Sequence, residues 1–176
     1  MAEVRKGEVT MKGNPIDLVG PKLKAGDAAP DFTCVDTGLS PVSLKETAGK
    51  ARLFNVVPSL DTPVCSIQTK RFSQEINALG DKVAVYTISL DLPFAMKRFC
   101  ADNHIENLVN LSDAHNQSFG EHYGVLIDNL PIKLLARAIF VVDAHDKLTH
   151  VELVPEIATE PNYETALTAL KAAAGA

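Results

Sequence analysis

The three cysteines are the side chains in this sequence best suited to chemistry, and Cys65 has the most informative setting. It follows Thr62 and Pro63, a pair typical of a helix start, with threonine as the N-cap and proline at the first helical position. This spacing predicts that Cys65 occupies the third helical position. There, free backbone N–H groups and the positive end of the helix dipole favour a thiolate over a thiol.

The expected helix runs over about residues 63–79, and it carries an apolar stripe headed by Cys65. Phe72, Ile76 and Leu79 fall on the same side of the helix as this cysteine. Burial alone would make Cys65 an inert, small apolar residue, as free cysteines often are. Position alone therefore leaves a reactive and an inert interpretation open, and a reactive thiolate would still need a group that stabilises charge on a leaving atom.

Arg137 is the candidate for that group, because it interrupts the apolar run 134–142, which we expect to form a strand. Strand alternation directs it to one face together with Leu135, Ile139 and Val141. Arginine is rarely buried without a partner, so we expect an anion beside it. A Cys65 thiolate would serve, and the alternatives are a structural ion pair with Asp or Glu, or a strand end in water.

Cys100 shares the apolar side of a short expected helix, residues 93–103, with Leu92, Met96 and Phe99. It is either a packed thiol or a resolving thiol that attacks a sulfenic acid formed on Cys65. In the second case the helix must loosen before the two sulfurs can approach to ~2 Å. Cys34 lies in an expected strand, and we interpret it as structural.

The elements that must position these residues alternate along the chain. We expect helices over residues 63–79, 93–103, 118–123 and 163–174, strands over 32–35, 42–44, 52–57, 83–90 and 108–111, and hairpins formed by 3–10 with 16–19 and by 135–142 with 148–153. This is an α/β plan, compatible with a thioredoxin-like sheet flanked by helices and extended by an N-terminal β-hairpin. We expect one domain over residues 1–176, with residues 1–20 as the hairpin extension.

Composition limits the classes of function. The 176 residues are 46% hydrophobic and 22% charged, ordinary for a soluble folded protein. A net charge of −5 and the lack of a Lys/Arg-rich run argue against nucleic acid as a partner. No secretory signal or membrane-spanning run is recognisable, so we expect a cytoplasmic protein. In that reducing compartment, three cysteines favour buried thiols, metal ligands or redox catalysts over a disulfide scaffold.

The pattern Pro58-x-x-x-Thr62-x-x-Cys65 matches the peroxidatic motif of the peroxiredoxins. The longer run Pro-Ser-Leu-Asp-Thr-Pro-Val-Cys, with Phe99-Cys100 and Leu-Leu-Ala-Arg-Ala-Ile-Phe-Val-Val-Asp, resembles the bacterial thiol peroxidases, an atypical two-cysteine branch of that family. The resemblance spans nearly the whole chain. It departs at residues 66–70, where Ser-Ile-Gln-Thr-Lys replaces Ala-Thr-Ser-Val-Arg, so we do not expect the family's pocket details to carry over there.

The resemblance implies a thioredoxin-like fold and a homodimer with one active site per subunit. It makes Cys65 the peroxidatic cysteine and Cys100 the resolving cysteine, which closes an intrachain disulfide with it. Thr62 and Arg137 become the hydrogen-bonding and charge partners of Cys65, and Pro58 shields the thiolate. Hydrogen peroxide and alkyl or lipid hydroperoxides are the implied substrates, thioredoxin is the implied reductant, and no cofactor or metal is implied.

Three other classes of protein fit the sequence less well than a peroxidase. A thioredoxin-like disulfide reductase needs Cys-x-x-Cys, and here Thr62 occupies the place of the first cysteine. A Cys–His hydrolase would use one of the five histidines, but none lies in a recognisable signature. A non-catalytic redox or metal-binding module could use Cys100 and His104, one helical turn apart, but two ligands are too few for a closed zinc site.

Overall fold

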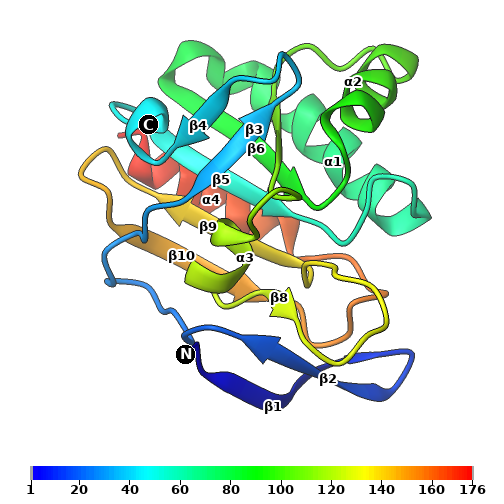
Figure 1. Cartoon of the computed structure of the whole chain (residues 1–176). Helices are drawn as coiled ribbons and strands as arrows, with labels where there is room; N and C mark the ends of the chain where they lie inside the picture. Colours follow the sequence, from blue (N-terminus) through cyan, green and yellow to red (C-terminus); the bar gives the residue numbers. More distant parts are fainter. Residues whose placement is uncertain (1, 176) are drawn as a thin grey trace.

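The computed structural model describes residues 2–175 and arranges them as two β-sheets with helices packed around the larger one (Figure 1). Within these residues the larger sheet has seven strands in the order β10-β9-β5-β6-β7-β3-β4. Their bounds are β3 Thr33–Asp36, β4 Pro41–Ser43, β5 Ala51–Val56, β6 Val83–Ser89, β7 Val109–Ser112, β9 Ala138–Val142 and β10 Leu148–Leu153. The expected thioredoxin-like α/β plan is confirmed. The two end residues of the expected domain, 1 and 176, lie outside the described residues.

Three parallel strands form the centre of this sheet, and two helices connect them. β5 pairs in parallel with β6, and β6 with β7. α1 (Pro63–Ile76) lies between β5 and β6 in the chain, and α2 (Pro93–Asp102) lies between β6 and β7. Because both helices start just after the carboxyl end of a parallel strand, their first turns lie at the same edge of the sheet.

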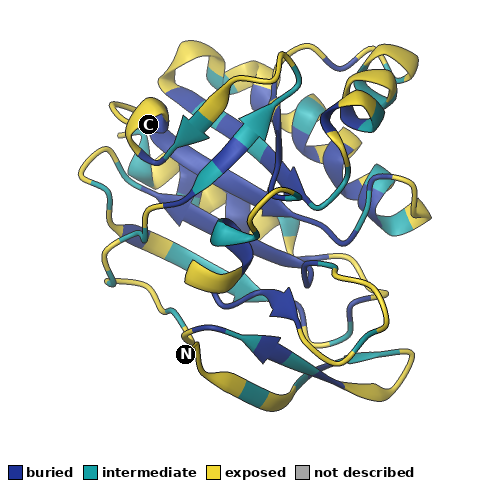
Figure 2. Ribbon diagram, in the orientation of Figure 1, coloured by how far each residue is buried: buried dark blue, intermediate teal, exposed yellow. Residues whose placement is uncertain are grey.

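The two faces of the sheet bury different clusters, and β5 shows the division. All six of its residues are buried, as the dark central strands of Figure 2 show. Leu53 packs with residues of α1 and of α4 (Tyr163–Ala173), whereas Phe54 packs with Phe119 of α3 (Ser118–His122). Covering both faces explains why the central strands read as apolar runs rather than as alternating patterns.

The N-terminal hairpin is confirmed and forms a second sheet. β1 (Val4–Met11) pairs with β2 (Asn14–Val19), and β2 pairs with the two-residue strand β8 (Leu126–Ile127). The Glu156 carboxylate holds the hairpin turn, accepting hydrogen bonds from Thr10 Oγ1 at 2.6 Å and from the backbone N–H of Lys12 at 2.8 Å. No helix in residues 2–175 is long and apolar enough to cross a membrane.

Two local predictions were wrong. The strand expected to begin at Leu135 begins at Ala138, because Leu135 makes an isolated bridge to β8 and packs on the α3 face. Leu135 therefore lies on the opposite face from Ile139 and Val141, which pack with α1 and α4. Leu92 is 59% exposed, because it is the N-cap residue of α2 and not part of its buried side.

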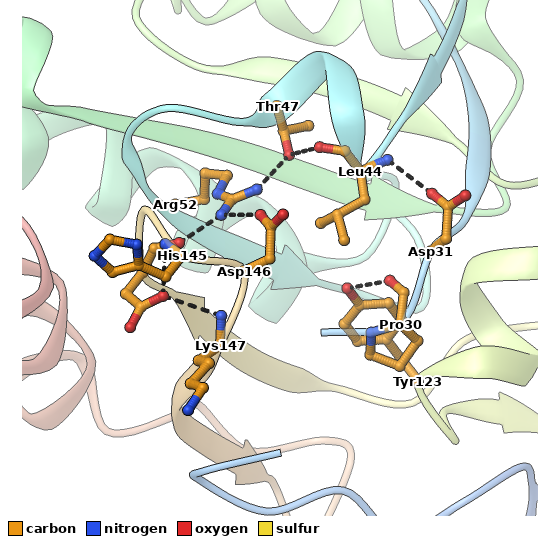
Figure 3. Close-up of polar contacts among 10 residues, drawn as sticks. Pro30, Asp31, Leu44, Thr47, Arg52, Tyr123, His145, Asp146 and Lys147 are labelled. Atoms are coloured by element: carbon orange, nitrogen blue, oxygen red, sulfur yellow. Dashed lines mark hydrogen bonds and ion pairs between the residues drawn. The ribbon is translucent and has the colours of Figure 1, made fainter. Parts of the chain in front are cut away.

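Arg52 is a fully buried charge near the start of β5, and it joins three segments (Figure 3). Its guanidinium donates to Thr47 Oγ1 at 3.0 Å, to Asp146 Oδ1 at 2.6 Å and to the backbone carbonyl of Asp143. Thr47 belongs to the short 3-10 turn before β5, and the two aspartates belong to the turn between β9 and β10. One side chain thus fixes both segments against the start of the central strand.

We predict that Arg52→Met lowers the free energy of unfolding by roughly 2–3 kcal/mol, because the variant loses charge-assisted hydrogen bonds and leaves acceptors unpaired. Urea denaturation measures this. The matched control is Lys24→Met, which removes the exposed ion pair between Lys24 and Asp27 and should cost less than about 1 kcal/mol. Equal losses in the two variants would contradict a structural role for Arg52.

Candidate active site

Cys65 lies at the third position of α1, as predicted, and has no exposed surface. Val57, Leu60 and Met96 pack around it, with Phe99 beside them. Val57 and Leu60 come from the loop after β5, whereas Met96 and Phe99 come from α2 (Figure 1). The thiol is therefore closed off by two separate segments, and a solute reaches it only when one of them moves.

Thr62 and Pro58 lie in the loop that leads into α1. Thr62 is the N-cap residue, as predicted, but its hydroxyl donates to the backbone carbonyl of Ser59 at 2.9 Å and does not cap the helix. Among residues 2–175, no hydrogen bond joins Thr62 to Cys65. Pro58 is buried at the end of β5. The Thr62 hydroxyl must therefore turn away from Ser59 before it can reach the sulfur.

Arg137 is 2% exposed, and its partners are neutral rather than anionic. Its Nε donates to the backbone carbonyl of Ile157 at 2.7 Å, and one terminal nitrogen donates to Gln68 Oε1 at 2.8 Å. No carboxylate in the described part of the chain forms an ion pair with it. The alternative of a structural ion pair with Asp or Glu is thus wrong: Arg137 meets a backbone carbonyl and the amide of Gln68, which lies three residues after Cys65 on α1.

Gln68 begins a buried chain of amides that the sequence analysis missed. Its Nε2 donates to Asn55 Oδ1, and Asn55 Nδ2 donates to the hydroxyls of Thr69 at 3.2 Å and Thr87 at 3.1 Å. All four side chains have no exposed surface. Gln68 and Thr69 fall in the segment 66–70, where the chain departs from the family pattern, and that departure was the available signal.

Asp91 is a second residue that the sequence analysis missed. Its carboxylate accepts hydrogen bonds from Ser59 Oγ at 2.8 Å, from the backbone N–H of Leu60 at 2.8 Å and from Ser89 Oγ at 2.7 Å. Asp91 lies just before α2, so it fixes the loop around Pro58 to the base of the helix that carries Cys100. In the sequence, Asp-Leu-Pro indicates only a turn before a helix.

Cys100 is half-buried in the last turns of α2, and it forms no disulfide. Burial raises the pKa of its thiol, and a hydrogen bond from Asn110 Nδ2 to its sulfur, 2.7 Å long, opposes that rise. Met96, one helical turn earlier, packs on Cys65. A bond between the two sulfurs needs about 2 Å, so α2 must rearrange before Cys100 can reach Cys65.

Cys34 lies on the other face of the sheet, with no exposed surface. Its thiol donates to Asp113 Oδ1 at 3.6 Å, and the same carboxylate accepts the backbone N–H groups of Phe119 and Gly120 at the start of α3. Burial, together with the Asp113 charge, raises the pKa of Cys34 far above its usual range. These contacts agree with a structural thiol.

Metal ligands do not gather in this region. Within residues 2–175, no group of three or more His, Cys, Asp or Glu side chains is placed to hold a metal ion. Cys100 and His104 therefore have no third ligand among the described residues.

Comparison with known proteins gives consistent matches over the chain. The Redoxin family model matches residues 24–167. Thiol peroxidases of Halalkalibacterium halodurans and Listeria innocua are 51% and 49% identical, each over 94% of this chain and over 98% and 99% of their own lengths. The crystal structure of a peroxiredoxin-like protein from Aquifex aeolicus, 43% identical, superimposes with a TM-score of 0.88 over 96% of this chain and 99% of its own.

We predict that Asp91→Ala speeds hydrogen exchange at the Leu60 amide by roughly 10–100-fold, because the partly buried carboxylate no longer holds that N–H. Hydrogen-exchange mass spectrometry of residues 58–62 measures this. Asp61→Ala is the matched control, since the exposed Asp61 carboxylate accepts no hydrogen bond from the described residues. Unchanged exchange at Leu60 in Asp91→Ala would show that the loop is held by other contacts.

Proposed function

We infer that this chain, which belongs to the Redoxin family, is a peroxiredoxin-type thiol peroxidase that reduces hydroperoxides at Cys65. The observation that most supports this role for Cys65 is its position in the first turn of α1, on the helix whose Gln68, three residues further on, binds the buried Arg137 guanidinium. The N–H groups of that turn and the Arg137 charge both favour a sulfur anion. A fully buried thiol without such groups would be inert.

In the first step, the Cys65 thiolate attacks one oxygen of the hydroperoxide and breaks the O–O bond. Oxygen is transferred to sulfur, which becomes a sulfenic acid, and the other oxygen leaves as water or an alcohol after taking a proton. Arg137 donates to the leaving oxygen as its charge develops, and Thr62 donates to the peroxide after turning from Ser59. Pro58 and the apolar cluster exclude water from the thiolate.

In the second step, the Cys100 thiolate attacks the sulfenic sulfur of Cys65 and displaces hydroxide, which becomes water on protonation. The product is an intrachain disulfide, and a dithiol reductant of the thioredoxin type returns both thiols. The packing of α2 supports this step. Only Pro93 and Met96 are buried in it, and local unfolding of such a weakly packed helix costs little.

The remaining assignments follow from the same family. Hydrogen peroxide and alkyl or lipid hydroperoxides are the substrates. The protein works as one domain that assembles as a homodimer, in the cytoplasm, where thioredoxin keeps it reduced. No observation favours a hydrolase or a metal-binding module as a second function.

We predict that one equivalent of hydrogen peroxide removes two of the three thiols per chain and that peptide mapping finds Cys65 joined to Cys100, with Cys34 free. Cys65→Ser abolishes peroxide consumption coupled to thioredoxin and its reductase. Cys100→Ser completes one turnover and stalls at the sulfenic acid. Undiminished thioredoxin-dependent cycling by Cys100→Ser would refute its resolving role.

We predict that Arg137→Met slows sulfenic acid formation by about 100-fold or more, because the leaving oxygen loses its donor. Arg137→Lys should not restore the rate, since an ammonium cannot reach both Ile157 and Gln68 in the same planar geometry. Dimedone trapping after rapid mixing with peroxide measures the rate, and circular dichroism checks the fold. The control Arg71→Met removes an exposed ion pair with Glu75 and should stay within roughly twofold of wild type. A rate for Arg137→Met that also stays within roughly twofold of wild type would exclude the role of Arg137 as a donor to the leaving oxygen.

A further inference from the structure

Asn110 is a buried amide on β7 whose only side-chain hydrogen bond within residues 2–175 goes to Cys100. The side chain is 3% exposed, and its Nδ2 lies 2.7 Å from the sulfur. The carbonyl oxygen of the same amide is buried without a partner. Leaving an acceptor unpaired in the interior costs about 1–3 kcal/mol, so the amide is not explained by stability.

The position of Asn110 in the sheet also indicates that its amide has a role other than stability. Asn55, Thr87 and Asn110 are register partners on three adjacent strands, so they form one buried polar row on the face covered by α1 and α2. Asn55 and Thr87 are hydrogen-bonded to each other. Asn110, at the end of the row, makes no side-chain bond to them and meets only the sulfur.

An amide offers two different groups to a cysteine. Its N–H group acts as a hydrogen-bond donor to the sulfur and so favours the thiolate. Its oxygen would instead accept a hydrogen bond from the S–H group and so favour the thiol. Here the N–H end faces the sulfur. The hydrogen bond therefore lowers the pKa of Cys100 and opposes the effect of burial, which is the main cause of its raised pKa.

Charged side chains near Cys100 do not replace this contact. The cluster packed against it from α1, β6 and the loop after α2 is apolar, and includes Phe72, Ile76, Val85 and Ile105. The Lys, Arg, Asp, Glu and His side chains on these elements are exposed: Lys70, Arg71 and Glu75 on α1, Lys97, Arg98 and Asp102 on α2, and His104 and Glu106 after it. The amide is therefore the polar group that touches the sulfur.

We propose that Asn110 is a positioning residue for the resolving step, which holds the sulfur of Cys100 in the reduced protein and favours its anionic form for attack on Cys65. This inference rests on the proposed resolving role of Cys100. When the disulfide forms, Cys100 leaves and the Asn110 N–H loses its hydrogen bond to the sulfur. The same contact therefore draws α2 back to its place after reduction.

The experiment follows disulfide formation after one equivalent of hydrogen peroxide, by acid quench and mass spectrometry, between about pH 6 and pH 9. Asn110→Leu keeps the volume and removes the donor, so the midpoint of the pH profile should rise by about 0.5–1 unit. The plateau at high pH should not fall, because the helix is less restrained. Asn110→Asp places a carboxylate beside the sulfur, and its midpoint should rise further.

Val109→Asn is the matched control, because it puts the same amide one residue away, on the opposite face of β7, where Val109 is 45% exposed. Its midpoint should equal that of wild type. Dimedone trapping of the Cys65 sulfenic acid in each variant tests whether the fold and the first step are intact. An unchanged midpoint in Asn110→Leu overturns this inference alone, whereas a Cys100→Ser variant that cycles normally overturns the proposed function.

Discussion

Arg137 carries a permanent charge into a part of the protein with almost no exposed surface, and a guanidinium can only donate hydrogen bonds. Gln68 must therefore present its oxygen to Arg137, which leaves its nitrogen for the oxygen of Asn55. Asn55 in turn can only donate to the threonine hydroxyls. The direction of every bond in this chain is set by the arginine. A glutamate in place of Gln68 would accept the same bond but neutralise the guanidinium charge that the proposed mechanism uses.

The second constraint is that α2 serves Cys65 and Cys100 at once. Met96 covers Cys65, and Cys100 follows one turn later on the same helix. Loosening α2 therefore uncovers one sulfur and frees the other in a single movement. The Asp91 carboxylate binds the loop that precedes α1 and so fixes the N-terminal end of α2 to that loop. This end of α2 therefore stays ordered when the rest of the helix loosens.

Structural features that depend only on neighbouring residues were predictable from the sequence. Thr62 and Pro63 located the start of α1, because the backbone angles that proline favours at the first helical position depend on neighbouring residues only. The partner of Arg137 was not predictable in this way, because a glutamine on the buried side of α1 and the carbonyl of Ile157 meet it only after three segments pack together. Likewise, Leu135 was assigned to the wrong face, since a bridge to two-residue β8 leaves no periodic pattern.

The placement of Cys34 has a consequence for how the chain behaves under oxidant excess. Three cysteines can pair in three ways, and only the pairing of Cys65 with Cys100 belongs to the proposed catalytic cycle. Cys34 lies on the opposite face of the central sheet from the other two sulfurs, and burial together with the Asp113 charge raises the pKa of its thiol. A disulfide with Cys34 would require the sheet to open, so the fold itself favours the Cys65–Cys100 pairing that the proposed mechanism uses.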